Sequence, residues 1–183
     1  MRACAYVIGP QDGPGAALLD MARGLGFEHV SPYAGIAAAE AQAAQTPICF
    51  FFFSAVESAS GLRSHVEAIR YCATRRLRFS PLIYFSESPS AETIKLCINM
   101  GFDDVITLPF IQARLDERLA RQVGQPKVYF ETPGYFGPDR RNQLAEQTRM
   151  QDRRHSGPYR RLEIIRNVLT GITVLRDEHC VAA

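Results

Sequence analysis

Apolar residues in the first two thirds of the chain gather in short runs that have the length of β-strands. The clearest run, Ile48 to Phe53, is apolar at every position, as expected for a central strand that is buried on both faces of a parallel sheet. Turn-forming residues follow several of the runs, for example Gly9-Pro10 after the first. The pattern predicts strands at residues 3–8, 27–33, 48–53, 82–85 and 105–108.

The segments between these runs have apolar residues three and four positions apart, which is the spacing of a helix with one buried face. One helix is predicted to start at Ser88-Pro89-Ser90, where a serine can cap the first turn, and to end at Gly101. The predicted helices cover residues 16–23, 36–44, 62–72, 91–100 and 111–123. Such alternation of strands and helices predicts an α/β fold, because right-handed crossovers place helices on both faces of a parallel sheet.

The pattern changes at Gly124. Residues 124–161 are rich in Gly, Pro, Gln and Arg without a sustained apolar period, and they contain two similar segments, 137–141 and 157–161. We interpret this stretch as a linker or arm between a domain at 1–123 and a C-terminal segment at 162–183. In that segment an apolar stripe with helical spacing predicts an amphipathic helix; its members are Leu162, Ile165, Leu169 and Ile172. Gly171 weakens a helix by about 1 kcal/mol relative to Ala, so a strand at 172–175 is the alternative.

Composition narrows the class of protein. Hydrophobic residues make up 46% and charged residues 22% of the chain, which is typical of a globular protein, and the net charge of +2 does not by itself indicate nucleic-acid binding. No apolar run reaches the roughly 18 residues of a membrane span, and the first run is too short for a secretory signal, so we expect a cytoplasmic protein. The five cysteines are scattered, so we expect reduced thiols and predict no metal or other cofactor.

Several features of the first 123 residues resemble the receiver domain of response regulators in two-component signal transduction. Gly26-Phe27 leads into the second strand, Gly61-Leu62 opens the third helix, and the segment 101–104 precedes the fifth strand. The most specific piece is Val105 to Phe110, which ends Leu108-Pro109-Phe110 where receivers usually end Lys-Pro-Phe. The resemblance implies a CheY-like, flavodoxin-like fold with strand order 2-1-3-4-5, and a cis bond between Leu108 and Pro109.

The same resemblance indicates that the phosphorylation chemistry is lost. Receivers bind Mg²⁺ with an acid pair after the first strand and an acceptor Asp at the end of the third, and a Ser or Thr and a Lys contact the phosphoryl group. The matching positions here are, in order, Gly9 and Pro10, Phe53, Ser86 and Leu108. Only Ser86 keeps its residue type, and Val105 stands at the position of the switch aromatic. The resemblance therefore implies a degenerate pseudo-receiver.

Neighbouring residues do not restore this chemistry. Asp12 lies two positions past the acid pair and Glu57 four past Phe53, while Ser54 has no base beside it. Ser86 itself is also explained by ordinary turn chemistry ahead of a helix. The Gly-rich loop 9–15 lacks the Lys-Ser/Thr of a phosphate-binding loop, and its prolines remove amide donors. With no catalytic constellation visible, we do not expect an enzyme.

Arginines are concentrated between residues 139 and 161, where seven of them face three acids and no lysine occurs. Arginine favours bidentate contacts with carboxylates and phosphates. A solvated linker, a protein-partner motif, and a site for nucleic acid or a cyclic dinucleotide are the alternatives. The candidate residues are Arg140, Arg141, Arg153, Arg154, Arg160 and Arg161.

The sequence thus favours a phosphorylation-independent interaction or dimerisation module in bacterial signalling. We expect a homodimer or a complex with a signalling protein, formed by the helix at 91–100, the strand at 105–108, the helix at 111–123 and the C-terminal stripe. The alternative is a regulator whose Arg-rich arm binds an anionic ligand, either DNA or a cyclic dinucleotide.

Overall fold

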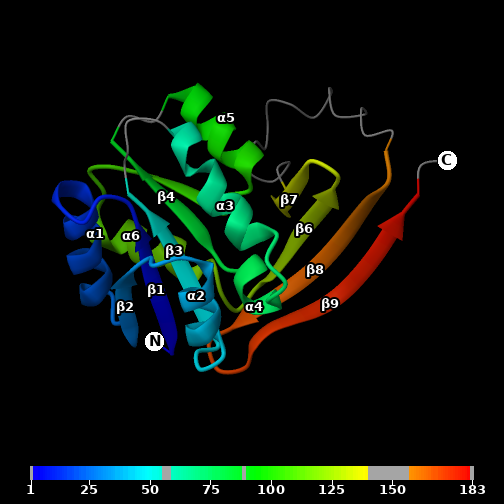
Figure 1. Cartoon of the computed structure of the whole chain (residues 1–183), viewed down its shortest axis with the longest axis horizontal. Coiled ribbons are helices and arrows are strands. Elements are labelled where there is room, and N and C mark those ends of the chain that lie inside the picture. The colour runs from blue at the N-terminus through cyan, green and yellow to red at the C-terminus, as the bar shows by residue number, and fades with distance from the viewer. Residues whose placement is uncertain (1, 55–58, 88–89, 140–156, 182–183) are drawn as a thin grey trace.

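The computed structural model describes residues 2–54, 59–87, 90–139 and 157–181, which form two β-sheets packed end to end (Figure 1). The N-terminal part holds a parallel sheet with helices on both faces, and the C-terminal part holds an antiparallel sheet. No helix in the described part of the chain is long and apolar enough to cross a membrane.

The parallel sheet has the strand order β2-β1-β3-β4-β5, as predicted. Its strands are β1 (Ala3–Ile8), β2 (His29–Pro32), β3 (Ile48–Phe53), β4 (Leu82–Ser86) and β5 (Asp104–Thr107). Every residue of β1, β3 and β4 is buried, which explains why these strands are apolar except for Ser86 at the end of β4. This order and direction define the flavodoxin-like fold of receiver domains.

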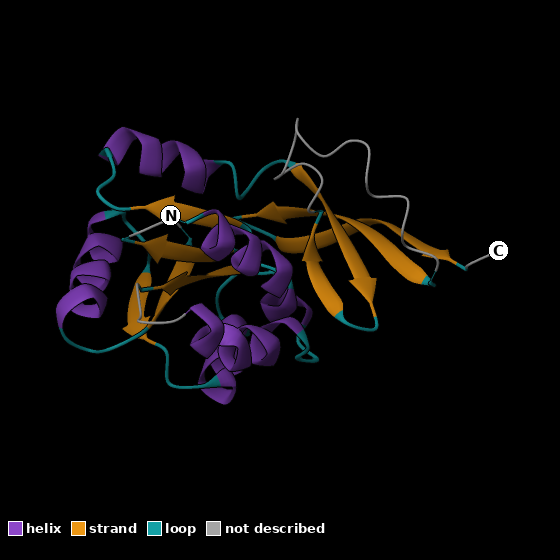
Figure 2. Ribbon diagram, turned by 90° about the horizontal axis from the view of Figure 1, so that it is seen from above, coloured by secondary structure: helices purple, strands orange, loops and turns teal. Residues whose placement is uncertain are grey.

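Helices cover the parallel sheet on both faces (Figure 2). The core on one face contains residues of α2 (Ile36–Ala43), α3 (Arg63–Arg70), α4 (Arg75–Arg78) and α5 (Ala91–Met100). The core on the other face contains residues of α1 (Gly13–Gly24) and α6 (Gln112–Ala120). A 3-10 turn, η1 (Ala59–Leu62), precedes α3. The predicted cap of α5 is confirmed, because the Ser90 hydroxyl accepts a hydrogen bond from the Thr93 amide at 3.0 Å.

The C-terminal part corrects two predictions. Residues 124–161 are not simply a linker, since they contain β6 (Pro126–Thr132) and β7 (Tyr135–Pro138). The predicted C-terminal helix is wrong as well: β8 (Tyr159–Asn167) and β9 (Gly171–Cys180) form a hairpin there. The four strands make an antiparallel sheet in the order β7-β6-β8-β9.

The stripe that suggested a helix is divided by this hairpin. The alternation of β8 turns Leu162, Ile164 and Arg166 to the buried face, and Ile165 falls between them on the other face. Leu169 lies in the turn and is 63% exposed, while Ile172 returns to the core of the second sheet. The four residues therefore do not form one interface, and Leu162 is covered within the same chain.

The second sheet packs where β4 and β5 begin. Its core includes Phe79, which precedes β4, together with Tyr129 and Phe136 from β6 and β7. The backbones also meet closely, because a Cβ atom added to Gly137 would lie 2.7 Å from the Gly101 Cα atom. The second sheet is thus joined to the parallel sheet at the end opposite to the carboxyl ends of its strands (Figure 1).

Candidate functional site

The position of the phosphoacceptor holds an aromatic ring in the core. Phe53 ends β3, has 0% exposure, and has Ile8 of β1 and Tyr84 of β4 as its neighbours in register. Its ring centroid lies 4.8 Å from that of Phe102 in an edge-on arrangement. Phe53 therefore packs as a core residue and offers no group that can attack a phosphodonor.

The position of the acid pair is shaped by a close approach between β1 and β3. Gly9 has φ 151°, and a Cβ atom added there would lie 1.7 Å from the Ser54 Oγ atom. Ser54 is buried, and its hydroxyl donates to the Ile8 carbonyl at 3.3 Å. An acidic side chain at position 9 does not fit beside Ser54, and Pro10 is exposed. Asp12 is also exposed, just before α1.

The remaining positions complete an apolar environment at this end of the sheet. Ser86 is buried at the end of β4, and its carbonyl accepts from the Leu108 amide at 2.8 Å. Leu108 is half-buried against the core beneath α1 and α6, and its bond to Pro109 is cis, as expected. Val105 packs partly buried on the opposite core. Among the described residues, no group of three His, Cys, Asp or Glu side chains is arranged to hold a metal ion.

A second polar centre, which we call the buried arginine cluster, lies where the two sheets meet. It consists of Arg70, Asp103, Tyr129 and Arg166. The Asp103 carboxylate accepts from Arg70 and Arg166, each at 2.7 Å, and from the Tyr129 hydroxyl at 2.6 Å. It also accepts from the Leu82 amide at 2.9 Å. One carboxylate thus joins α3, the start of β4, β6 and β8.

The two guanidinium groups are satisfied by backbone carbonyls near helix ends. Arg70 donates to the carbonyls of Gly101, Arg78 and Ser80, at distances from 2.7 to 3.1 Å. Arg166 donates to the Phe79 carbonyl at 2.7 Å, to Gln122 at 3.3 Å, and to the Tyr129 hydroxyl. Carbonyls at helix C-termini carry partial negative charge, which helps to offset two buried cations that share one carboxylate.

The pKa values in the cluster follow from burial and charge. Burial raises the pKa of Asp103, but the charges of Arg166 and Arg70 and the Tyr129 hydrogen bond outweigh it, so the net pKa lies well below its usual range. Burial is also the main reason that the pKa of Tyr129 is raised. At neutral pH Asp103 is therefore charged and Tyr129 is protonated. The hydrogen bonds and ion pairs of the cluster connect the two sheets.

Little in the sequence predicts this cluster. Arg166 lies at a position where β8 alternation requires an inward side chain, yet a charged residue there interrupts the apolar pattern. Asp103 belongs to the segment 101–104 that carried the receiver resemblance, and its side-chain partners are 26 to 63 residues away in sequence. If residues 159–167 are taken as a strand, every second side chain from Leu162 onward points inward, and Arg166 falls at one of these positions. That alternation is the one signal in the sequence that singles out Arg166.

The structure places two of the six candidate arginines. Arg160 forms a two-point contact with Asp177, with both distances 2.7 Å, and a further contact with Glu131 at 3.2 Å. Arg161 contacts Glu178 at 3.2 Å. Both are thus paired with acids inside the second sheet. Arg140, Arg141, Arg153 and Arg154 lie outside the described residues, so binding of nucleic acid or a cyclic dinucleotide by this stretch stays a prediction.

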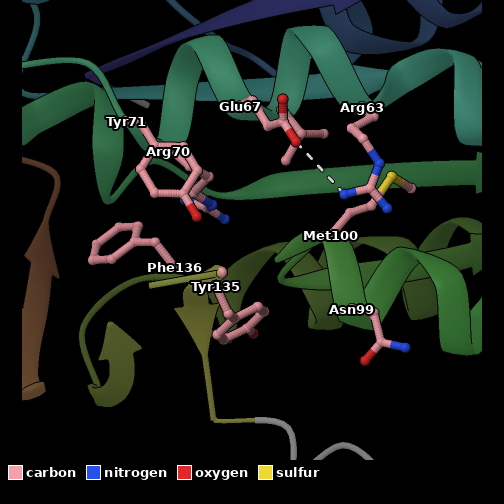
Figure 3. Close-up of a pocket in the computed structure, with 10 residues that line it drawn as sticks. Arg63, Glu67, Arg70, Tyr71, Asn99, Met100, Tyr135 and Phe136 are labelled. Carbon is pink, nitrogen blue, oxygen red and sulfur yellow. Dashed lines mark ion pairs between the residues drawn. The ribbon is translucent and has the colours of Figure 1, made fainter. Parts of the chain in front are cut away.

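A narrow cleft separates α3 and α5 from the hairpin of β6 and β7 (Figure 3). Arg63 and Glu67 form an ion pair at 3.5 Å along one wall, and Tyr135 and Phe136 stand on the other. The cleft has a volume of about 20 Å³. Because a single water needs about 10–15 Å³ by this measure, the cleft is too small for an organic ligand.

Solved structures of response regulators are similar to about two thirds of this chain. No family model matches the chain, and no curated protein matches it. A solved response regulator from Thermotoga maritima is 16% identical, with 66% of this chain and 97% of that chain covered and a TM-score of 0.47. The receiver domain of a sensor histidine kinase from Pseudomonas aeruginosa PAO1, solved with magnesium in its active-site cleft, is 22% identical over 65% of this chain and 95% of that chain, with a TM-score of 0.47.

A response regulator from Desulfuromonas acetoxidans is 20% identical over 65% of this chain and 94% of that chain, with a TM-score of 0.42. The fold itself is assigned from the strand order and direction of the parallel sheet, which are those of receiver domains.

Proposed function

We propose that this protein is a pseudo-receiver that acts in bacterial signal transduction by protein–protein contact, without phosphorylation and without catalysis. The observation that carries the proposal is the fully buried Phe53 at the acceptor position. Gly9 supports it, because the adjacent Ser54 leaves no room for one of the metal-binding acids.

The contact surface that we propose is the edge of the parallel sheet at β5, together with α5 and α6. Two large apolar side chains are exposed on these flanking elements: Ile94 in α5 is 36% exposed, and Ile111, just before α6, is 69% exposed. Isolated exposed hydrophobics are common on protein surfaces. The support here comes from their position, since the resemblance to receivers implies that this edge contacts partners.

The second sheet leaves this surface available. The buried arginine cluster lies ahead of β4 and β5, whereas Ile94 and Ile111 follow the carboxyl ends of those strands. The two features are therefore at opposite ends of the same pair of strands. We propose that the β5 edge mediates a symmetric homodimer, the commonest assembly of soluble oligomers, or a complex with a signalling partner.

Sedimentation velocity of the full chain at micromolar concentrations tests the dimer. We expect a dimer for the natural chain and a monomer for Ile111→Asp, because an apolar contact cannot accommodate an unpaired carboxylate. Leu169→Asp is the matched control, since Leu169 is equally exposed in the turn between β8 and β9 and should leave the dimer intact. A monomeric natural chain would exclude the homodimer and leave only a different signalling partner.

A further inference from the structure

A larger pocket lies between α4 and the second sheet, on the seam that joins the two parts of the molecule. Its volume is about 230 Å³. The walls include the apolar side chains of Phe79 and Phe136 and, from β8 and β9, Leu162 and Val174. Ligand pockets for drug-sized molecules occupy about 300–1,000 Å³, so this pocket, which we call the seam pocket, suits a smaller molecule.

The charged residues of the seam pocket carry an excess of one positive charge. Glu131 accepts from Arg78 at 2.9 Å and from Arg160 at 3.2 Å, and Asp177 pairs with Arg160. Arg75 also lines the pocket but has no ion-pair partner among the residues that the structure describes. The hydrogen bond from Arg160 lowers the pKa of Asp177, and the charge of Arg75 adds to this effect, so Arg75 acts on the same site.

Arg78, like Arg75, has a group without a partner among the described residues, in this case a hydrogen-bond donor. Its guanidinium carbon lies 4.2 Å from the centroid of the Phe136 ring, a cation–π contact that supports the charge without supplying a hydrogen-bond acceptor. Within the described part of the chain, its Nε atom is buried and has no hydrogen-bond partner. A buried donor without an acceptor is costly; because this atom is closed off from solvent, an oxyanion in the pocket would satisfy it only after a shift of the Arg78 side chain.

We propose that the seam pocket binds a small monocarboxylate that has an apolar, ring-like body. The carboxylate would neutralise the unpaired positive charge and contact Arg75 and Arg78, while the body would lie against Phe79, Leu162 and Val174. A phosphate monoester, which carries about −1.5 to −2 at neutral pH, would overshoot the single excess charge beside Glu131 and Asp177. Because Arg75 and Phe79 belong to the first part and Leu162 and Val174 to the second, such a ligand would bridge both parts.

This proposal goes beyond the proposed function and does not depend on it. A protein that has lost phosphorylation can still receive a chemical input, and binding at the seam would stabilise the docked arrangement of the two sheets through mass action. The ligand would thus take the role of an input signal at the end of the molecule opposite to the former phosphorylation site.

Calorimetric titration of the full chain with three probes tests the proposal: benzoate, phenyl phosphate and uncharged benzyl alcohol. We expect saturable binding of benzoate, weaker binding of phenyl phosphate and no binding of benzyl alcohol. Arg75→Gln should weaken benzoate binding about tenfold or more, as expected for the loss of a hydrogen bond to a charged group. Arg75 is exposed and unpaired among described residues, so this change should not alter folding.

Arg23→Gln is the matched control, because Arg23 is an exposed arginine of α1, paired only at the surface with Asp20, and does not line the pocket. It should leave benzoate affinity unchanged. Absence of saturable benzoate binding at millimolar concentrations would overturn the proposal, as would equal weakening by both variants. Tighter binding of phenyl phosphate than of benzoate would overturn the carboxylate assignment. Sedimentation without ligand tests the proposed function separately.

Discussion

Phe53 is a core residue at the position that the receiver resemblance assigns to the phosphoacceptor. A carboxylate at the end of β3 would need a cation and polar neighbours, whereas the ring of Phe53 packs on Phe102 between two apolar strands. Acids clustered without their cation repel each other. Apolar side chains at Phe53 and Leu108 remove that repulsion at this end of the sheet.

We predict that Phe53→Asp will not restore phosphorylation and will destabilise the fold by several kcal/mol, because it buries an unpaired charge and removes a core ring. Chemical denaturation monitored by circular dichroism measures the loss. Phe53→Leu, which stays apolar, should cost clearly less. An unchanged denaturation midpoint for Phe53→Asp would show that the side chain is not buried.

Asp103 is expected to make the stability of the fold sensitive to acid. Its pKa in the folded chain is lowered by Arg166 and Arg70 against the effect of burial, while in the unfolded chain a pKa near 4 is expected. A group whose folded pKa is depressed contributes stability above its unfolded pKa and loses that contribution as the pH falls towards the folded pKa. The contribution of Asp103 should therefore be complete at neutral pH and decline below about pH 4.

Asp103→Asn should lower the free energy of unfolding at neutral pH by about 3–5 kcal/mol, because two buried arginines lose their shared countercharge. Between neutral pH and pH 3 the variant should also lose less stability than the natural chain. Urea denaturation at a series of pH values measures both effects. Parallel pH profiles for the two proteins would contradict the role assigned to Asp103.

At the scale of elements, the strands of the parallel sheet could be predicted because burial on both faces makes β1, β3 and β4 apolar up to the final Ser86 of β4. The one-turn helix α4 was missed because Arg75–Arg78 is too short to show a period. The predicted C-terminal helix is wrong because Leu162, Ile165, Leu169 and Ile172 fit helical spacing by coincidence, whereas the alternative strand at 172–175 lies within β9. The alternation of apolar and polar residues in β8 is difficult to recognise in the sequence, because the charged Arg166 occupies one of the inward positions.

The assignment of Phe53 and Leu108 to the positions of the acceptor Asp and the Lys rests on the register of the receiver resemblance and stays a prediction. The structure shows where these residues lie, since Phe53 is buried in one apolar core and Leu108 packs against the other. The seam between the sheets could not be predicted, since it depends on contacts such as that of Arg166 with Phe79, 87 residues apart.

Gly137 offers a test of how β7 docks on the end of α5. A Cβ atom there would lie 2.6 Å from the Tyr135 hydroxyl oxygen and 2.7 Å from the Gly101 Cα atom. Gly137→Ala should therefore destabilise the protein by about 1–3 kcal/mol, the usual cost of overpacking. Gly134→Ala is the control, because its Cβ atom would meet nothing within 4 Å, and it should change thermal stability little. Equal melting temperatures for the two variants would argue against the close approach.

At the scale of the whole molecule, three features lie at separate places. The positions that the receiver resemblance assigns to a phosphorylation site are at the carboxyl ends of the parallel strands, the β5 edge flanked by α5 and α6 is the proposed contact surface, and the second sheet is held at the opposite end by the buried arginine cluster. The second sheet is thus part of the folded body. The seam pocket proposed as a ligand site lies where the two sheets share side-chain contacts.

The most direct test of the central claim is intact-protein mass spectrometry of the full chain after incubation with acetyl phosphate and Mg²⁺, with a phosphorylatable receiver domain as the positive control. The account predicts that the control gains a phosphoryl group while the mass of this protein stays unchanged, because Phe53, Gly9 and Leu108 supply neither nucleophile, metal ligand nor cation. A phosphoryl group attached within residues 1–123 would contradict it.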